Sequence, residues 1–287
     1  MASSLAYEVH HYGKDSELQR VGVWKTSDTE LQSSETWIIY IHGGAWRDFR
    51  IDHKTLTPTI NAILSSQDAG KTSIAGFASI DYRLSPHPSF PQDPEKTPSQ
   101  EYRKAFHPDH IHDVWSALGL LQKTYGFGSN YVLLGHSAGA TLALQLLMGS
   151  TALKGAPVPS DVMRPRAIIG LEGIYDLQGL VDRHGPAYGE LFEGAFGEAT
   201  NWSDVSPMKY ENDFKSDWKE GELVVLAWGP DDELIDEPEI QGMNKRLIED
   251  KVRTLVFKDL KGTHDGMWED GKPFADTILK TLSALKK

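Results

Sequence analysis

The sequence of 287 residues has no cysteine, relatively few cations and no long hydrophobic run. Without cysteine the chain can form neither a disulfide nor a thiolate metal site, which is typical of a reducing compartment. Its 29 lysines and arginines against 41 acidic residues give a net charge of −12, which disfavours nucleic acid and anionic membranes as partners. No segment approaches the roughly 20 apolar residues that cross a bilayer. The first residues also lack the basic and apolar regions of a signal peptide, so we expect a cytoplasmic protein.

Hydrophobic residues make up 39% of the chain, enough for a sizeable core. Short β-type runs alternate with helical segments, which predicts a mostly parallel sheet with helices on both faces, an α/β fold. We expect one domain, residues 1–287. Predicted strands are 37–41, 74–81, 131–134, 167–171, 222–228 and 254–257, preceded by an antiparallel pair, 7–11 and 20–25. Predicted helices are 56–65, 111–125, 141–148, 239–249 and 274–285.

Two stretches depart from this alternation. Residues 85–108 contain six prolines and no apolar periodicity, so we expect an irregular, ordered connection that borders the active site. Residues 182–214 are rich in glycine and aromatics and follow a predicted central strand. Cap elements are often inserted at this position, and we expect them here.

The most informative motif is Gly135-His136-Ser137-Ala138-Gly139, between an apolar β-type run and a helical segment. This strand–turn–helix context predicts a nucleophile elbow with Ser137 as the nucleophile. Glycines flank the serine because the strained turn leaves no room for side chains. The helix N-terminus beneath it favours the negative charge that develops during acyl transfer.

A serine nucleophile needs a base, and in sheets of this kind the chain order is serine, acid, histidine. Only His184 and His264 follow Ser137. The loop after the predicted strand 222–228 is where the acid should lie, and His184 precedes it. His264, in the loop after the last predicted strand, is therefore the predicted base.

Three aspartates lie in the acid loop: Asp231, Asp232 and Asp236. We favour Asp232, because the Asp-Glu-Leu sequence that it begins resembles the acid loop of esterases. The other two are alternatives that the sequence leaves open. The acid would orient the imidazole and stabilise its cation without accepting the proton itself.

A second glycine cluster, Gly43 and Gly44, follows the predicted strand 37–41. Backbone N–H groups must approach a tetrahedral oxyanion to about 2.7–3.1 Å, and glycine permits that approach. We predict an oxyanion hole formed by the amides of Gly43, Gly44 and Ala138. The neighbouring His42 is expected to brace the loop.

No cofactor or metal site is predicted. His110 and His112 lie two residues apart on a predicted helix and so face away from each other. Gly43-Gly44 also lacks the Lys-Ser/Thr that follows the glycines of a phosphate-binding loop.

Together these motifs resemble the α/β-hydrolase fold and, within it, the kynurenine formamidases (arylformamidases) of the fungal type. The resemblance runs from about residue 37 to the C-terminus. The H-G-G-x-W signature ends in Trp46, whereas the related hormone-sensitive-lipase-like esterases have H-G-G-G, and residues 85–108 are longer than the minimal family pattern. The matching segments are His42-Gly43-Gly44-Ala45-Trp46, Tyr82-Arg83-Leu84-Ser85-Pro86, Gly135-His136-Ser137-Ala138-Gly139, Gly173-Ile174-Tyr175-Asp176-Leu177, Asp232-Glu233-Leu234 and Thr263-His264.

The resemblance implies a serine hydrolase that cleaves N-formyl-L-kynurenine to L-kynurenine and formate, in tryptophan catabolism towards NAD. Bacterial enzymes with the same activity are metal-dependent and carry an H-x-G-T-H-x-D-x-P motif. Gly262-Thr263-His264 matches only part of that motif, which argues against the metal route. The alternatives are a general small-molecule carboxylesterase of the hormone-sensitive-lipase-like group and, from another class, a non-catalytic hydrolase-fold receptor.

Trp46 and Tyr175 are the aromatic residues that we expect to contact the substrate ring. Arg47 or Arg83 is expected to meet a substrate carboxylate. The expected partner is a small molecule, and the sequence leaves a homodimer open.

Overall fold

The computed structural model describes residues 5–25, 35–68 and 74–286. Its centre is an eight-stranded sheet in the order β1-β2-β4-β3-β5-β6-β7-β8. From β4 onward neighbouring strands are parallel, whereas β1 and β2 form an antiparallel pair at one edge. The strands are β1 (Ala6–His11), β2 (Arg20–Lys25), β3 (Thr36–Ile41), β4 (Ile74–Ile80), β5 (Tyr131–His136), β6 (Ala167–Leu171), β7 (Leu223–Ala227) and β8 (Thr254–Phe257).

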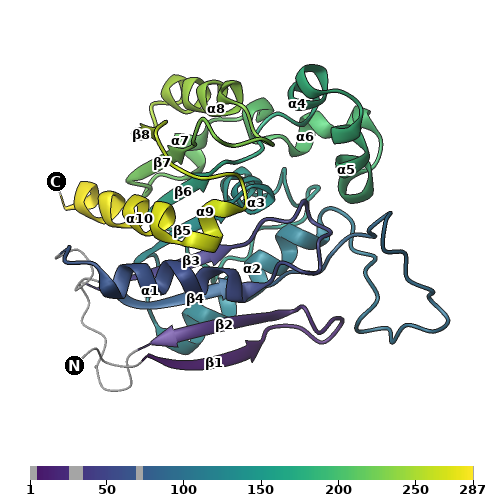
Figure 1. The fold of residues 1–287 in the computed structure, drawn as a ribbon, viewed down its shortest axis with the longest axis horizontal. Coiled ribbons are helices and arrows are strands. Elements are labelled where there is room, and N and C mark those ends of the chain that lie inside the picture. Colours follow the sequence, from purple (N-terminus) through teal and green to yellow (C-terminus); the bar gives the residue numbers. More distant parts are fainter. Residues whose placement is uncertain (1–4, 26–34, 69–73, 287) are drawn as a thin grey trace.

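Helices cover both faces of the sheet (Figure 1). Helices α1, α9 and α10 pack on one face, and α2, α3 and α8 lie on the other. Within the described residues no helix combines the length and apolar character that a membrane span requires. The α-helices are α1 (Thr57–Ser65), α2 (Asp109–Tyr125), α3 (Ala138–Met148), α4 (Leu177–His184), α5 (Ala187–Phe196), α6 (Trp202–Val205), α7 (Phe214–Asp217), α8 (Glu237–Glu249), α9 (Gly266–Asp270) and α10 (Lys272–Leu285). Short 3₁₀ helices are η1 (His53–Leu56), η3 (Ala199–Asn201) and η4 (Pro207–Lys209).

The central strands are buried on both faces, and their side chains alternate between two hydrophobic clusters. In β3, Trp37 and Ile39 join the cluster beneath α2 and α3, whereas Ile38 and Tyr40 join the cluster beneath α1 and α10. This is the expected pattern for a parallel strand covered by helices on both sides. Burial of apolar area on both faces therefore fixes the carboxyl ends of the strands relative to one another.

The predicted strands and helices are all present, with small differences at their ends. The largest difference is at β5, which extends to His136, and at α3, which begins at Ala138 rather than at residue 141. The apolar run ends at Leu134, but Gly135 and His136 still pair with β6. A single residue, Ser137, therefore separates strand from helix.

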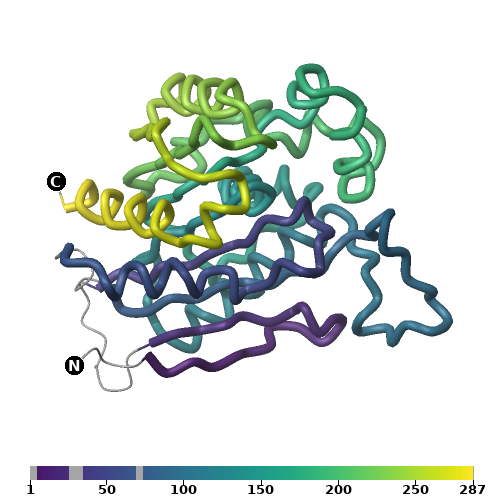
Figure 2. Tube along the Cα trace, in the orientation of Figure 1, coloured from purple at the N-terminus to yellow at the C-terminus, as the bar shows by residue number. Residues whose placement is uncertain are grey.

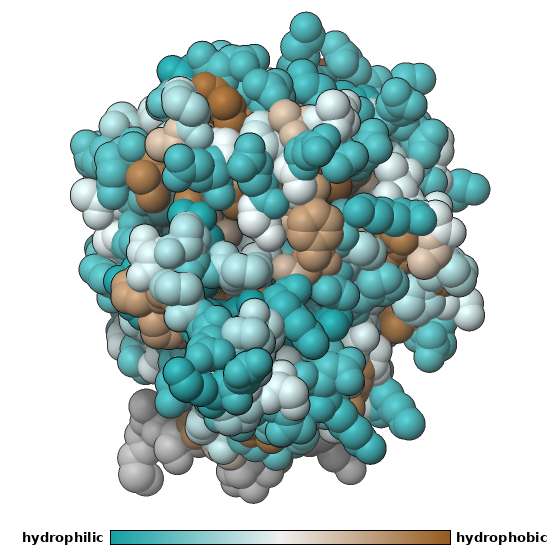
Figure 3. Space-filling view, turned by 90° about the vertical axis from the view of Figure 1, so that its right-hand side faces the viewer, coloured by the Kyte–Doolittle hydropathy of each residue, from teal (hydrophilic) through white to brown (hydrophobic). Residues whose placement is uncertain are grey.

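Both irregular segments lie toward the carboxyl ends of the parallel strands, on the right in Figures 1 and 2. Residues 85–108 contain no helix or strand and extend outward as a broad loop. Residues 182–214, here called the cap, carry the end of α4, then α5, η3, α6 and η4. Figure 3 views the molecule from this side, where a mostly hydrophilic surface surrounds separate hydrophobic areas.

Gly139 determines how closely α3 approaches β3. A Cβ atom at this position would lie 2.1 Å from the carbonyl oxygen of Ile41 and 2.6 Å from that of His42. We expect Gly139→Ala to destabilise the protein by about 3 kcal/mol, because backbone on both sides would have to move. Urea unfolding measures this change. Gly119→Ala in α2 is the matched control, since its Cβ would meet only a Val162 methyl group at 3.2 Å. Equal stability of the two variants would contradict this packing.

Candidate active site

Ser137 occupies the sharp turn between β5 and α3. Its backbone angles are φ 52° and ψ −122°, a strained conformation for a residue with a side chain. The turn is held because the Ser137 amide donates to the Leu171 carbonyl at 2.9 Å. A Cβ on Gly135 would lie 2.3 Å from the carbonyl oxygen of Gly139, so the flanking glycines are required by close backbone contact. This sharp turn makes the serine side chain project from the end of β5.

The glycine loop after β3 lies directly against the nucleophile. A Cβ on Gly43 would lie 3.1 Å from the Cβ of Ser137 and 3.0 Å from Nδ1 of His136. Gly44 has φ +90°, a conformation that favours glycine. The loop therefore places its backbone beside Ser137, where the predicted oxyanion donors must be.

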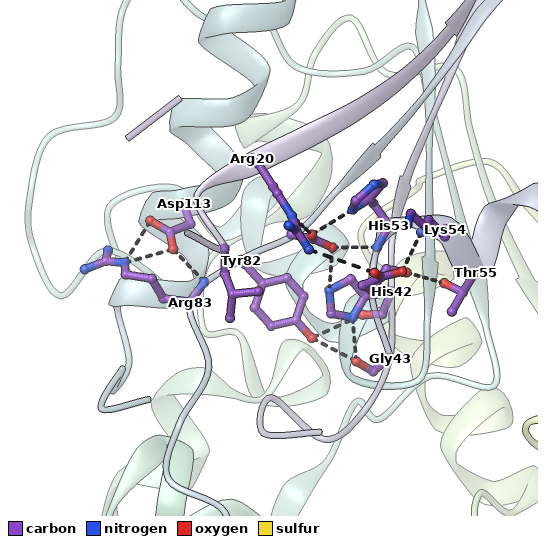
Figure 4. A network of polar contacts seen from close by, with 12 residues as sticks. Arg20, His42, Gly43, His53, Lys54, Thr55, Tyr82, Arg83 and Asp113 are labelled. Atoms are coloured by element: carbon purple, nitrogen blue, oxygen red, sulfur yellow. Dashed lines mark hydrogen bonds and ion pairs between the residues drawn. The ribbon is translucent and has the colours of Figure 1, made fainter. Parts of the chain in front are cut away.

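Two buried side chains fix the orientation of this loop (Figure 4). The Tyr82 hydroxyl lies 3.2 Å from the His42 carbonyl and 3.0 Å from the Gly43 carbonyl. Nδ1 of His42 also donates to the Gly43 carbonyl at 2.9 Å. Because a peptide unit is planar, fixing these two carbonyls also fixes the N–H groups of Gly43 and Gly44.

Asp81 supports the same loop through the histidines on either side of it, and its side chain has no exposed surface. It accepts from the backbone N–H and Nδ1 of His53, at 2.5 and 2.8 Å, and from Nε of Arg20 at 2.6 Å. Nε2 of His42 lies 3.5 Å away. Burial alone would raise the pKa of Asp81, but these partners lower it, so the carboxylate stays charged.

His264 and Asp232 meet above the carboxyl edge of the sheet, from the loops after β8 and β7. Nδ1 of His264 lies 3.0 and 3.1 Å from the two carboxylate oxygens of Asp232. Oδ1 of Asp232 also accepts from the backbone N–H groups of Leu234 and Ile235, at 2.8 and 3.0 Å. With Nδ1 engaged, Nε2 of His264 is the nitrogen left for the serine.

The other two aspartates of this loop are placed differently. Asp236 binds Arg183 at 2.6 Å and His184 at 2.9 Å. Asp231 is exposed. Among the described residues, Asp232 is the aspartate that contacts His264, so the geometry favours it over the two alternatives.

Ser137 and His264 line the same cavity of about 430 Å³. This volume lies within the ~300–1,000 Å³ of typical small-molecule sites. His87, from the proline-rich segment 85–108, also lines it, so that segment borders the site. The apolar walls come from the glycine loop, the cap and the loops after β6 and β7, with Ile51, Ile174, Ala187, Leu191, Leu234 and Ile235.

The chain is similar to known proteins in sequence and in fold. No family model matches the chain. The kynurenine formamidase-like hydrolase fscH of Fusarium equiseti is 38% identical over 266 residues, covering 87% of this chain and 84% of that protein. The chain belongs to the kynurenine formamidase family. The kynurenine formamidase avaC of Aspergillus versicolor is 35% identical over 266 residues, covering 84% and 87% of the two chains. Esterase B of Lactobacillus rhamnosis has the same α/β-hydrolase fold, with a TM-score of 0.68 at 15% identity over 99% of this chain and 87% of its own.

The arrangement of groups around Ser137 can perform serine-based acyl transfer. It combines a serine hydroxyl on the cavity lining, an imidazole oriented by a buried carboxylate, and backbone N–H groups beside the serine. The cavity next to them is mostly apolar with a few charged groups, as in small-molecule sites generally.

Two sequence-based expectations for the substrate pocket are corrected. Trp46 and Tyr175 are both fully buried, and neither lines the cavity. Trp46 packs edge-on against Phe192 and Phe196 beneath the cap. The phenol oxygen of Tyr175 is directed at Gly170 and Gly173, inside the core. Both rings support the site from the core rather than forming its wall.

The two arginines that we considered for the substrate carboxylate lie in different places. Arg83 is held by Asp113 at 2.9 Å and by Asp109 at 3.4 Å, away from the cavity. Arg47 lines the cavity, donates to the Glu190 carbonyl at 3.3 Å, and forms no ion pair with another described residue. Its partial burial lowers the pKa of the guanidinium, so an anionic partner there would be favourable.

Sequence reasoning missed Glu172, which lies directly behind the histidine. Its carboxyl group is fully buried, 3.6 Å from Nδ1 of His264 and 3.4 Å from Nε2 of His136. A charged residue immediately after an apolar strand was the available signal, since strand carboxyl ends carry functional groups in this architecture.

The atoms that His136, Glu172 and His264 offer lie within 4.8 Å of one another, close enough to be considered as metal ligands. However, the nitrogen that His264 directs toward Glu172 is Nδ1, which already contacts Asp232. His136 and Glu172 are therefore better described as residues that position His264 than as metal ligands.

Tyr82→Phe tests the support of the oxyanion loop. We expect kcat to fall about 3- to 10-fold with KM within about twofold, because one hydrogen-bonding hydroxyl orients both peptide units. Steady-state kinetics measures the effect. Tyr131→Phe is the matched control, since its buried hydroxyl donates to the Met163 carbonyl at 2.9 Å, away from the site. If both variants lose activity equally, Tyr82 has no special role in the loop.

Proposed function

We propose that this protein is a kynurenine formamidase that hydrolyses N-formyl-L-kynurenine to L-kynurenine and formate. The observation that carries the proposal is the placement of strained Ser137 and the Asp232–His264 pair on one cavity. Membership of the family supports the choice of substrate, because relatives at 35–38% identity carry the name kynurenine formamidase or kynurenine formamidase-like hydrolase.

In the first half-reaction, Oγ of Ser137 attacks the formyl carbon while Nε2 of His264 accepts the hydroxyl proton. The amides of Gly43, Gly44 and Ala138 bind the oxyanion of the tetrahedral intermediate. The imidazolium then protonates the anilino nitrogen, the C–N bond breaks, and kynurenine leaves. Asp232 stabilises the imidazolium throughout and does not accept the proton.

In the second half-reaction, His264 removes a proton from water as the water attacks the formyl ester on Ser137. The same amides bind the second oxyanion, and its collapse releases formate and returns the proton to the serine. An aryl amine is a better leaving group than an alkyl amine, so serine chemistry suits an arylformamide. The fold-sharing esterase makes a general carboxylesterase the alternative function.

The charged lining of the cavity fits the amino-acid end of this substrate. Arg47 offers a guanidinium that forms no ion pair with another described residue, which suits the α-carboxylate. Asp48 and Asp265 lie on the same lining. Because Asp48 pairs with Arg50 at 2.6 Å, Asp265 is the carboxylate that suits the α-ammonium group. The apolar wall is left for the aromatic ring.

Activity toward two substrates tests the function. We expect kcat/KM for N-formyl-L-kynurenine to exceed that for p-nitrophenyl acetate, because the cavity offers charges that only the amino acid can use. We also expect Ser137→Ala to abolish turnover of both, since it removes the nucleophile. Product formation is followed by absorbance, and circular dichroism confirms folding. A formamide rate no better than the ester rate would favour the carboxylesterase, and retained activity in the alanine variant would remove the serine mechanism.

Arg47→Met tests recognition of the substrate carboxylate. We expect KM for N-formyl-L-kynurenine to rise about 10-fold, because a charge-assisted hydrogen bond is lost, with little change in kcat. The KM for the neutral analogue 2′-formamidoacetophenone should stay the same.

The matched control is Arg166→Met. Arg166 has the same charge, pairs with Glu222 at 2.8 Å, and directly precedes β6 at the opposite end of the sheet. It should leave both KM values unchanged. An equal rise for the charged and neutral substrates in Arg47→Met would show that the arginine acts through the shape of the cavity.

A further inference from the structure

Glu172 is a buried acid that the reaction described above does not use. It follows β6, has φ +48°, and has no exposed surface. Its backbone N–H donates to the Ala227 carbonyl at 2.8 Å, which fixes the residue between the carboxyl ends of β6 and β7. A positive φ in a residue other than glycine is uncommon, and such strain is concentrated at functional sites.

The donor Nδ1 of His264 lies 3.6 Å from Glu172 but is engaged by Asp232 at 3.0 Å. Neither carboxyl oxygen receives a hydrogen bond from a donor group among the described residues. Asp232 lies within side-chain hydrogen-bonding reach, and two carboxylates cannot bond to each other without a shared proton. One of the two acids must therefore hold a proton for this contact to be favourable.

The hydrogen bonds that Asp232 and Glu172 receive determine which of the two acids holds the proton. Asp232 accepts from two backbone N–H groups and from Nδ1 of His264, all of which stabilise its charged form. Glu172 has no such donors, and a fully buried charge without them is costly. The charge therefore belongs on Asp232 and the proton on Glu172.

His136, on the other side of Glu172, gives an independent indication. Its ring donates to the His264 backbone carbonyl, and because Nε2 has no hydrogen-bond partner, the donor is Nδ1. Burial holds the pKa of His136 well below its usual value, so Nε2 carries a lone pair. That lone pair lies 3.4 Å from Oε2 of Glu172, and an ionised carboxylate would repel it more strongly than a neutral carboxyl group does.

We propose that Glu172 is a positioning residue, held protonated between Asp232 and His136, whose O–H donates to Asp232 and so holds that carboxylate against His264. Burial and the charges of Asp232, Glu233 and Asp265 raise the pKa of Glu172 to about 11, consistent with this role. When His264 becomes an imidazolium, the hydrogen-bonded acid pair carries one negative charge rather than two.

The test compares Glu172→Gln, which keeps a donor of the same shape, with Glu172→Leu, which removes it. The readout is the rate of inactivation by a fluorophosphonate, which reports serine activation whatever the natural substrate is. We expect the glutamine variant to react within about threefold of wild type and the leucine variant to react about 10- to 100-fold more slowly. Equal losses in both variants would overturn the proposal.

The pH dependence of the same rate separates a neutral Glu172 from an ionised one. A neutral side chain adds no charge beside His264, so Glu172→Gln should leave the acid limb of the profile where it is in wild type. An ionised Glu172 would stabilise the imidazolium, and its loss would move the acid limb down by about one pH unit. Such a downward shift would contradict the proposal.

Two measurements keep the result interpretable. Thermal unfolding checks that the leucine variant folds, and if it does not, the pH profile of the glutamine variant still decides. The proposal rests on the serine mechanism proposed above, and the two fail differently. A wild-type protein that does not react with the fluorophosphonate would remove the mechanism, whereas a reactive wild type with a shifted glutamine profile would remove only the role of Glu172.

Discussion

The strained turn at Ser137 is the constraint from which the rest of the site follows. Ser137, at φ 52°, lies between a buried strand and a buried helix. Glycines in the strand, the helix and the neighbouring loop leave room for this conformation, because they have no side chains. Gly135 and Gly139 let α3 approach the sheet, and Gly43 lets the neighbouring loop touch the serine itself. The same close contacts that raise the nucleophile therefore bring the backbone donors next to it. The proposed nucleophile and the proposed oxyanion donors therefore belong to one packing arrangement.

Close packing alone would not orient those donors, and the polar network beneath them does so. Tyr82 and His42 bond to carbonyls of the glycine loop, and planar peptide units transmit that orientation to the N–H groups on the other side. Asp81 in turn anchors the loop through His53, and its charge is balanced by Arg20. A buried network of this kind is rigid when every member is satisfied. Rigidity matters here because donors fixed before the reaction need no reorganisation as charge develops on the substrate.

Much of this could be predicted from the sequence, for physical reasons that also mark where prediction ends. The order of Ser137, Asp232 and His264 along the chain was readable because each follows a strand, and parallel strands bring such ends together. Glu172 follows a strand in the same way, but a buried acid has no local signature that separates it from an exposed one. Trp46 was misplaced because the left-handed conformations of Ala45 and Trp46, φ 48° and 60°, accompany a ring buried under the cap rather than in the cavity. That packing depends on Phe192 and Phe196, distant in sequence, and no local pattern encodes it.

The core and the loops have different roles: the core holds the reacting groups in place, and the loops line the cavity proposed to hold the substrate. An esterase with 15% identity shares the fold at a TM-score of 0.68, so the fold is compatible with very different sequences. The charged groups of the cavity lining come instead from the connections: Arg47 and Asp48 from the glycine loop, and Asp265 from the histidine loop. These connections carry no ladder hydrogen bonds of the sheet, so they can change without disturbing the triad. Substrate preference in this chain is therefore best sought in the loops that close the cavity, while the catalytic geometry is set by the core.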